Sequence, residues 1–414
     1  MRDWFLRLDF FERPVVWVSA GVALMLVVVT VAVLLTDEPV PVVESLEKDR
    51  RVWVDVALFR QPRSRRVRIL EGECRVREAD RRLGAFDVQQ VDRVGLTLRL
   101  CPFTDEADNE GRCEKRQRFE LSCRSPAVVA GRRAKRRIGR RLRMEVRGDG
   151  ISVVAYLDLE RYIDSVVRSE HPRAPYEAQR AQAIVTRTFA MHAMGDPRHH
   201  EASLCDSPHC QVYRGQPPDA EGPSAANSTA GAYLVDGAGE VAPSYFHSTC
   251  GGQTLSASRV WPGTNEDIIG VADVDDEGRD WCRGSRYHRW SHRVSDVDLA
   301  RALAGAVDRS LDAKTLRLSG SRDGQSWRIG DNKGTKRVKG AKVHRVLGRR
   351  IGWDHILSPR FVARRRGRDF KLVGVGLGHG VGLCQTGAAA RAEAGQSAED
   401  ILTTYFPNLR VVRD

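Results

Sequence analysis

Several patterns that would assign the chain to a common class are missing. No internal repeat and no long low-complexity segment is visible in its 414 residues. The glycine-rich run near the C-terminus lacks the lysine of a phosphate-binding loop, and no acidic residue follows it at the distance that a dinucleotide-binding fold requires. We therefore interpret this run as tight, glycine-permitted backbone that brings His379 and Gln385 close to a ligand.

An excess of acidic residues is missing too. Lysine and arginine number 67 against 54 aspartate and glutamate residues, which gives a formal net charge of +13. This balance fits an anionic polymer, an anionic membrane surface or a nucleic acid, and arginine-rich coding bias explains it equally well. The basic run at residues 131–143 has two similar interpretations: it grips an anionic polymer or lipid headgroups, or it is a solvated ribbon. Charge alone therefore does not decide the partner.

A cleavage site for a secretory signal is missing as well. Val15–Leu35 contains 21 residues without a charge, which as a helix span about 31 Å, enough for a bilayer core. The residues that follow, Thr36–Pro39, contain no small-x-small pattern. Arginines precede the apolar segment and acidic residues follow it, so the positive-inside rule keeps the N-terminus in the cytoplasm. We expect a single-pass transmembrane anchor with the body of the chain outside the cytoplasm.

Cysteine is scarce and odd in number. Nine cysteines are present; outside the cytoplasm they can pair, and an odd count leaves at least one free, metal-bound or paired with another chain. The first half contains four, Cys74, Cys101, Cys113 and Cys123. Two local disulfides are compatible with this half, and one between Cys101 and Cys113 would close an acidic loop. The sequence does not fix the pairing.

The remaining patterns predict an α+β fold. Residues 51–154 contain strand-like runs separated by polar turns, and residues 158–194 contain two helical patterns with a short break between them. A helix is also expected at Val297–Ala306, and Ser397 with Asp400 predicts a capping box for a final helix. We divide the chain into a cytoplasmic stub with the anchor at 1–36, a linker at 37–50, a strand-rich part with inserted loops at 51–150 and a functional core at 151–414.

One carboxylate, Glu170, lies in the break between the two helical patterns. Pro172 disfavours helical angles at His171, and Pro175 suits the first turn of the next helix. Glu170 is therefore held between two rigid elements, where a catalytic acid is well placed. The alternative is a solvated glutamate at a helix end, which is the usual environment of this residue type.

Three blocks of the sequence resemble the stage II sporulation protein D and amidase-enhancer family of bacterial cell-wall proteins. They are L-E-R-Y-I-D-S-V-V-R-S-E-H-P with E-A-Q-R-A-Q-A-I-V-T-R-T-F-A, then C-Q-V-Y-R-G with Y-F-H-S-T-C-G-G-Q-T, and finally G-H-G-V-G-L-C-Q-T-G-A. Their order and spacing match the family over about residues 52–407, with a looser fit at 101–145 and 260–360. The resemblance implies an exported peptidoglycan-binding domain.

In the enzymatic members, the resemblance implies a lytic transglycosylase. Such an enzyme cleaves the bond between N-acetylmuramic acid and N-acetylglucosamine and leaves a 1,6-anhydro end on glycan strands whose stem peptides an amidase has removed. Glu170 matches the position of the catalytic glutamate. One carboxyl group is sufficient for this reaction because the 6-hydroxyl of the sugar itself attacks, whereas ordinary hydrolases need a second carboxylate.

Other residues are carried over from the same blocks. Arg187 matches the arginine of the second helix, where it orients Glu170 or binds a sugar substituent, or else forms a structural ion pair. The remaining polar residues of the two downstream blocks can donate hydrogen bonds to sugar hydroxyl or N-acetyl groups, or can be packed folding elements. These residues are Tyr245, His247, Ser248, His379 and Gln385.

Metal binding and disulfide formation compete for the downstream cysteines. The resemblance implies that some members hold a structural zinc ion with one histidine and two cysteines, here His199, Cys205 and Cys210, with His209 as a substitute ligand. A Cys205–Cys210 disulfide is the competing interpretation. Cys250 and Cys384 stand where relatives usually have small polar residues, and a disulfide between these two is a further hypothesis. No other cofactor is expected.

Two non-enzymatic alternatives remain beside the transglycosylase. One is an amidase enhancer that binds glycan or a cell-wall amidase without catalysing a reaction, and the other is an anchor that joins membrane to wall through its basic surface. Peptidoglycan strands are the expected partner in each case, and no nucleic-acid partner is expected. The expected location is the bacterial cell membrane, with the body in the periplasm or wall space.

Overall fold

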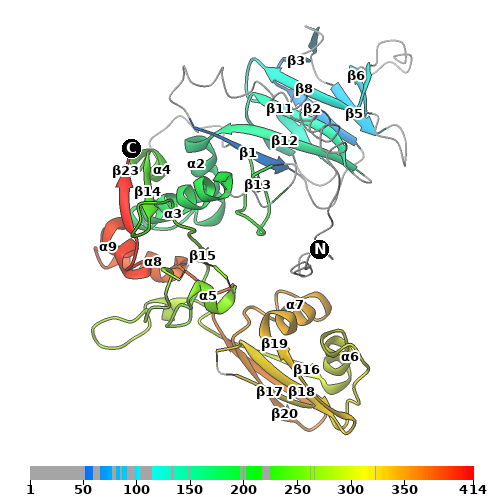
Figure 1. Cartoon of the computed structure of the whole chain (residues 1–414), viewed down its shortest axis with the longest axis vertical. Helices are drawn as coiled ribbons and strands as arrows, with labels where there is room; N and C mark the ends of the chain where they lie inside the picture. The colour runs from blue at the N-terminus through cyan, green and yellow to red at the C-terminus, as the bar shows by residue number, and fades with distance from the viewer. Residues whose placement is uncertain are drawn as a thin grey trace, which may run out of the picture. The chain divides into compact units, whose positions relative to one another are not determined.

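The chain folds as a mixture of helices and sheets, which confirms the α+β prediction (Figure 1). The computed structural model describes residues 52–414 except 59–65, 77–80, 84–85, 91–97, 103–113, 132–134, 148–149, 196–198, 200–201, 217–223, 262, 265 and 322. Residues 52–414 form one compact unit. The anchor expected at Val15–Leu35 lies outside the described residues. Among the helices that are described, none is both long enough and apolar enough to cross a bilayer.

The first sheet contains seven strands in the order β13-β1-β12-β11-β8-β3-β4. Apolar residues alternate with polar ones along its strands, so one face turns to the core, as Phe119 and Leu121 of β8 do. The strand bounds are β1 Trp53–Leu58, β3 Cys74–Val76, β4 Arg81–Leu83, β8 Arg118–Cys123, β11 Arg141–Arg147, β12 Gly150–Asp158 and β13 Leu204–Cys205.

A second sheet of six strands, ordered β10-β9-β2-β5-β6-β7, shares its core with the first. Ile69 and Leu100 of this sheet belong to the same buried cluster as Val54 and Phe119 of the other. Strands therefore occur throughout this part of the chain, as its alternating pattern predicts. The bounds are β2 Arg66–Glu71, β5 Phe86–Gln90, β6 Leu98–Pro102, β7 Glu114–Arg116, β9 Val128–Ala130 and β10 Lys135–Arg137.

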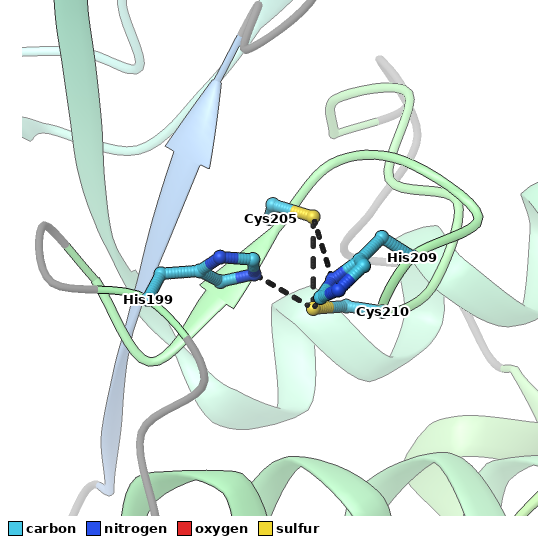
Figure 2. Close-up of side chains that lie close together, drawn as sticks. All are labelled: His199, Cys205, His209 and Cys210. Carbon is cyan, nitrogen blue, oxygen red and sulfur yellow. Dashed lines mark hydrogen bonds between the residues drawn. The ribbon is translucent and has the colours of Figure 1, made fainter. Parts of the chain in front are cut away.

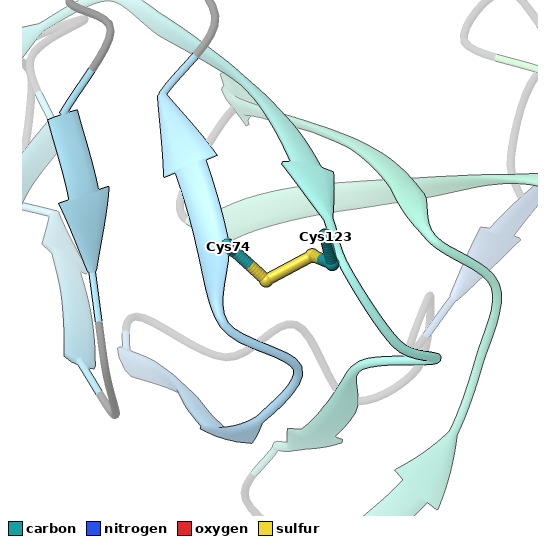
Figure 3. The surroundings of a disulfide bond; sticks show 2 residues. All are labelled: Cys74 and Cys123. Atoms are coloured by element: carbon teal, nitrogen blue, oxygen red, sulfur yellow. A yellow bond between two sulfur atoms is a disulfide. The ribbon is translucent and has the colours of Figure 1, made fainter.

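One disulfide ties the edge of the first sheet (Figure 3). Cys74 of β3 faces Cys123 of β8 in the antiparallel register, and their sulfur atoms are bonded. The two cysteines are separated by 49 positions in the sequence. A crosslink over a loop of that size substantially lowers the conformational entropy of the unfolded chain. The other pair suggested for this half, Cys101 with Cys113, lies outside the described part because Cys113 is not among the described residues.

Two helices follow directly from β12 and carry the predicted break. α2 spans Leu159–Glu170 and α3 spans Tyr176–Gly195. The Asp158 side chain caps α2 by accepting a hydrogen bond from the Arg161 N–H group at 3.1 Å, as expected of an aspartate at this position. The two helical patterns are therefore confirmed. Glu170 was expected in the break between them but is the last residue of α2, so the break begins one residue later, at His171.

The C-terminal elements pack back onto α3. α8 (Gln385–Glu393) and α9 (Ala398–Tyr405) both contact it, as does β14 (Ala232–Val235), which pairs antiparallel with β23 (Arg410–Arg413). The capping box predicted at Ser397 and Asp400 is present at the start of α9. Short helices complete this part: α4 Ala225–Ser228, α5 Ala257–Val260 and the 3-10 helix η2 Trp281–Gly284.

Residues 289–375 have a hydrophobic core of their own. Two three-stranded sheets, ordered β16-β21-β20 and β17-β18-β19, enclose Trp327 and Phe361 together with two helices. The sequence predicted α6 but only strand-like segments near α7. The apolar residues of this basic helix form only a short stripe, in which Val343 and Leu347 are buried and Val346 is partly buried. The bounds are β16 Arg289–Ser295, α6 Asp296–Val307, β17 Arg317–Gly320, β18 Ser326–Asp331, β19 Gly334–Lys339, α7 Gly340–Arg350, β20 Phe361–Arg366 and β21 Asp369–Val375.

Two glycine-rich turns meet where β15 (Phe246–His247) pairs in parallel with β22 (Leu383–Cys384). Gly382 has a φ angle of +70°, and a Cβ atom there would overlap the carbonyl oxygen of Tyr245. That carbonyl accepts a hydrogen bond from the Leu383 N–H group at 3.0 Å. Glycine is therefore needed at this position for both its backbone angle and its lack of a side chain.

Replacing Gly382 with alanine should destabilise the protein. The left-handed backbone costs about 1–2 kcal/mol for any other residue, and the overlap adds about 1–3 kcal/mol. Gly395 is the matched control because its φ angle is +89° but no atom lies within 4 Å of a Cβ there. Urea unfolding should show a larger loss for Gly382→Ala than for Gly395→Ala; equal losses would show that the close approach is not needed.

Candidate functional site

Glu170 is a partly buried carboxyl with a single hydrogen bond. Its Oε1 atom accepts from the Val212 N–H group at 2.8 Å. Burial raises the pKa of Glu170, although the Val212 hydrogen bond and the nearby Arg214 charge act in the opposite direction. A carboxyl with a raised pKa stays protonated to higher pH than an exposed one, which suits a general acid.

The loop that supplies Val212 is fixed to both helices. The Gln211 side chain donates to the carbonyl of Thr186 on α3 at 3.2 Å, and the Ser165 hydroxyl on α2 donates to the carbonyl of Gly215 at 2.5 Å. Between them, the rings of Tyr213 and Tyr162 stack with centroids 5.6 Å apart. The position of the hydrogen bond to Glu170 therefore depends on the packing of this loop.

The same loop carries a cluster of two histidines and two cysteines (Figure 2). His199 Nε2 lies 3.2 Å from Cys210 Sγ, and Cys205 Sγ lies 3.6 Å from Cys210 Sγ. His209 Nδ1 lies 3.6 Å from Cys210 Sγ. One ligand atom from each residue lies within 4.8 Å of all the others. Figure 2 shows the four side chains converging on one another.

These four residues fit a tetrahedral zinc site. Zn–S bonds of about 2.3 Å and Zn–N bonds of about 2.0 Å imply sulfur–sulfur distances of about 3.8 Å and sulfur–nitrogen distances of about 3.5 Å. The distances in the cluster are close to these values. His199, Cys205 and Cys210 are the residues expected from the sequence, and His209 lies in the same cluster, where it could supply a fourth ligand. The site would hold a structural metal, because four protein ligands leave no open position.

Neither disulfide considered for these cysteines is formed. Cys205, Cys210, Cys250 and Cys384 are all free thiols. The 3.6 Å between the sulfur atoms of Cys205 and Cys210 exceeds the bond length of about 2.05 Å. The hypothesis of a Cys250–Cys384 bond is likewise not met, since Cys384 Sγ instead accepts a hydrogen bond from the Cys250 N–H group at 3.2 Å.

Removing His209 tests the fourth ligand. We expect His209→Ala to weaken zinc binding at least tenfold, because even residues behind the ligands change metal affinity about 10–100-fold. Metal competition with a chromogenic chelator would measure the affinity. His192→Ala is the control, because His192 lies on α3 and its Nδ1 atom is 3.3 Å from the Val241 carbonyl oxygen. Equal zinc affinities of the two variants would exclude His209 as a ligand.

Arg187 is buried and does not pair with Glu170. Its Nε and Nη2 atoms donate to the two carboxylate oxygens of Glu160 at 2.7 and 2.5 Å, and further bonds go to the carbonyls of Ala226 and Ala232. Arg187 is only 1% exposed. The structure thus has the ion pair that was the alternative to a catalytic role, and it joins α2, α3, α4 and β14.

His247 and His379 lie together at the glycine turns, with ring centroids 5.5 Å apart. Both nitrogens of His379 are bonded to backbone: Nε2–H donates to the Phe246 carbonyl at 2.9 Å, and Nδ1 accepts from the Val381 N–H group at 3.1 Å. His247 Nδ1–H donates to the Val381 carbonyl at 3.1 Å, and its buried Nε2 has no hydrogen-bond partner among the described residues. Burial lowers the pKa of His247 to about 3 and that of His379 to about 4, so both rings are neutral near pH 7.

The other residues expected at the sugar site lie around this pair. Tyr245 packs on Trp261 with centroids 4.7 Å apart, and Trp261 lies 5.0 Å from the His379 ring. The Ser248 hydroxyl lies 3.4 Å from that of Thr249. The side-chain amide of Gln385 donates a hydrogen bond to the side-chain oxygen Oε1 of Gln182 on α3 at 3.4 Å.

The structure therefore has two groups of candidate residues. Tyr245, His247 and His379 form one group. Glu170 and the loop that carries the candidate metal ligands, His199, Cys205, His209 and Cys210, form the other. The hydrogen bond and the charges that act on Glu170 come from Val212 and Arg214, not from His247 or His379. Gln385, in the last of the three sequence blocks, donates a hydrogen bond to the Gln182 side chain on α3, the helix that follows Glu170.

The sequence did not single out four residues. Trp261 stacks beside His379, but it lies in the part of the chain with the loosest resemblance. Asp273 and Cys282 approach Cys250 and Cys384, although no spacing rule connects residues from four separate segments. His171 follows Glu170, and burial lowers the pKa of His171 to about 4. The sequence shows the position of this histidine in the motif, but its burial could not be predicted from the sequence.

Comparison with known proteins supports the resemblance to the cell-wall family. Residues 147–235 match the model of the family described as stage II sporulation protein. This segment contains Glu170, Arg187 and the four residues of the metal-binding cluster. The chain is therefore related to the stage II sporulation protein D family, at modest sequence identity.

Individual relatives agree with this assignment. An uncharacterized protein of Brachyspira hyodysenteriae (strain ATCC 49526 / WA1) is 26% identical over 268 residues, which cover 64% of this chain and 69% of that protein. Stage II sporulation protein D of Bacillus subtilis (strain 168) is 26% identical over 275 residues, covering 62% and 75%. The amidase enhancer of the same organism is 25% identical over 285 residues, covering 59% of this chain but 39% of the enhancer.

Proposed function

We propose that the chain is a peptidoglycan lytic transglycosylase in which Glu170 is the general acid and base. The proposal rests chiefly on the environment of Glu170: a partly buried carboxyl with a raised pKa at the end of α2, held by one backbone N–H group. The names of the related proteins agree with a function at the cell wall. The substrate would be a glycan strand without stem peptides, as the resemblance implies.

The reaction needs one carboxyl group used twice. Protonated Glu170 gives its proton to the oxygen between the two sugars as the bond from that oxygen to the anomeric carbon of the muramic acid breaks. The resulting carboxylate then takes the proton of the 6-hydroxyl group as its oxygen bonds to the same carbon. No water is consumed and a 1,6-anhydro end results. The Val212 N–H group stabilises the carboxylate between the two steps.

The surrounding residues would support this reaction without sharing the proton transfer. The metal-binding loop fixes Val212, and zinc at His199, Cys205, His209 and Cys210 would supply structural stability to that loop. Trp261 is partly exposed and offers aromatic surface to a sugar ring, and the buried Tyr245 and the partly buried His379 pack against it. We also propose that an N-terminal transmembrane helix at Val15–Leu35 holds this body outside the cytoplasm.

The direct test is product analysis with the full chain purified in detergent. Incubation with peptide-free glycan strands should release fragments with 1,6-anhydromuramic ends, identified by mass spectrometry. A complete lack of these fragments between pH 4 and pH 8 would exclude the transglycosylase.

The second candidate is a non-catalytic amidase enhancer, which the similarity to a protein of that name favours. Adding the chain to a cell-wall amidase and intact peptidoglycan would then accelerate release of stem peptides while producing no anhydro ends. Anhydro ends formed without any amidase present would exclude this alternative as the whole function.

A further inference from the structure

A second cluster of ligand-type side chains lies behind the glycine turns. It consists of Cys250, Asp273, Cys282 and Cys384, all of them buried, and one ligand atom from each lies within 4.8 Å of the others. Cys250 Sγ is 3.6 Å from Cys282 Sγ and 3.1 Å from Asp273 Oδ2. The proposed transglycosylase uses none of these four groups.

Four separate segments bring these residues together, and backbone hydrogen bonds fix them. Cys384 ends β22 and caps α8, Cys282 lies on η2, and Cys250 precedes the turn at Gly251 and Gly252. Asp273 is bonded on both sides: its N–H group donates to the Gly252 carbonyl at 2.9 Å, and its carbonyl accepts from the Trp281 N–H group at 2.9 Å. The cluster is therefore rigid before any ligand binds.

Simple packing does not account for the aspartate. Buried cysteines alone behave as small apolar residues, but Asp273 is 0% exposed, and an ionised carboxylate is costly to bury without partners. Its Oδ1 atom is bonded to Arg391 and to the Tyr405 hydroxyl. Its Oδ2 atom faces the Cys250 thiol, which is a weak donor. One carboxylate oxygen is thus aimed at the sulfur atoms.

The groups around the sulfur atoms suit thiolates. The N–H groups of Cys250 and Gly387 donate to Cys384 Sγ at 3.2 and 3.3 Å, and those of Gly251 and Gly252 point to the Cys282 sulfur. Zinc sites bind cysteine as the thiolate. The sulfur–sulfur distance of 3.6 Å between Cys250 and Cys282 is close to the roughly 3.8 Å implied by tetrahedral zinc.

The charges also balance. Three thiolates and one carboxylate carry four negative charges, and a divalent ion neutralises two of them. Arg391 pairs with Asp273 at 3.1 Å. Arg360 donates to the Cys250 carbonyl, and its charge interacts with Cys250, Cys282 and Cys384. These two arginines supply the remaining positive charges next to the ligands, as a buried ionic site requires.

We propose that Cys250, Asp273, Cys282 and Cys384 bind a second metal ion, a soft divalent cation of which Zn²⁺ is the first candidate. With four protein ligands the site is closed and structural. His247 lies opposite Cys384 in the pairing of β15 with β22, so the ion would crosslink the two glycine turns that carry His247 and His379. This site is independent of the proposed transglycosylase activity.

Metal analysis of cysteine variants tests the proposal on the full chain purified in detergent. Cys205→Ser with Cys210→Ser removes the first cluster, and this double variant should retain about one zinc ion per chain. Adding Cys282→Ser should remove that ion. The reciprocal variant, Cys282→Ser alone, should lose the second ion only. Elemental mass spectrometry gives the metal content, and circular dichroism checks that each variant is folded.

A second measurement does not depend on the folding of the Cys282 variant. Cobalt loaded into the Cys205→Ser, Cys210→Ser double variant should give the strong sulfur-to-metal charge-transfer absorption of several thiolate ligands. Peptide mapping of that protein under non-reducing conditions should find Cys250, Cys282 and Cys384 all alkylated. A disulfide between any two of the three, or the absence of both bound zinc and the cobalt absorption, would overturn the proposal.

Discussion

Glu170→Gln should abolish formation of anhydro ends, lowering the rate by at least about 10²–10⁴-fold, the usual contribution of a general acid. The amide oxygen of glutamine can still accept the Val212 hydrogen bond, so the fold and glycan binding should be retained. Chromatography of anhydro products from peptide-free glycan strands measures the loss. The affinity for the same strands, measured by sedimentation, should stay within about twofold, which is about 0.4 kcal/mol.

The same substitution should stabilise the protein near neutral pH. Burial raises the pKa of Glu170 in the folded state, so the group contributes favourably below its unfolded pKa and that contribution is lost as the pH rises through the folded pKa. Glutamine carries no charge to desolvate. Glu170→Gln should therefore unfold at a higher urea concentration than the wild type at pH 7, with the difference vanishing at pH 4.

The pH profile of activity should reflect Glu170 rather than the histidines. The pKa values of His247 and His379, at about 3 and 4, keep both neutral from pH 5 upward. Activity should fall on the alkaline side as Glu170 loses its proton. The control is Glu393→Gln, since Glu393 is the exposed last residue of α8. An unchanged rate in Glu170→Gln, or the same loss in Glu393→Gln, would contradict the assignment.

Arg187→Met should destabilise the folded protein by about 3 kcal/mol. The substitution keeps much of the length of the side chain but leaves Glu160 and the carbonyls of Ala226 and Ala232 without their donor. Breaking a buried ion pair costs about 3–5 kcal/mol, and we expect the lower end because the Glu160 side chain is 31% exposed and partly screened. Urea unfolding measures the difference.

Two further variants separate a structural role of Arg187 from a catalytic one. Adding Glu160→Gln to Arg187→Met should recover part of the stability, because the unpaired carboxylate is removed. Arg301→Met is the control: its pair with Asp298 has an arginine that is 75% exposed, so its loss should cost less than about 1 kcal/mol. Full stability of Arg187→Met combined with lost activity would instead show that Arg187 acts on the substrate.

Local sequence patterns were sufficient to predict the helices on either side of Glu170. Helical periodicity predicted α2 and α3, and Pro172 predicted the break between them. The sequence also predicted the capping box of Ser397 and Asp400. These features depend on residues within a few positions of one another, so their physics is contained in the local sequence. Helix α7 was missed because Val343 and Leu347, its only buried residues with apolar side chains, leave too weak a pattern in a basic segment.

Contacts between residues far apart in the chain could not be predicted from the sequence. The motif placed Arg187 beside the catalytic block, but only the fold shows that Glu160 rather than Glu170 is its partner. Likewise, the spacing of Cys205 and Cys210 allowed a disulfide or zinc, and the arrival of His199 and His209 at the same point favours the metal.

By itself, the sequence determined the α+β class, the glutamate between two helices and the relation to cell-wall proteins, because these follow from local periodicity and from contiguous motifs. Only the tertiary structure decided which side chains meet. The pKa of Glu170 is raised because the folded chain, including the loop that carries Val212, buries its carboxyl group. The tertiary structure also brought Cys282 and Asp273 to Cys250 and Cys384, because that meeting depends on four chain segments whose separation no sequence pattern encodes.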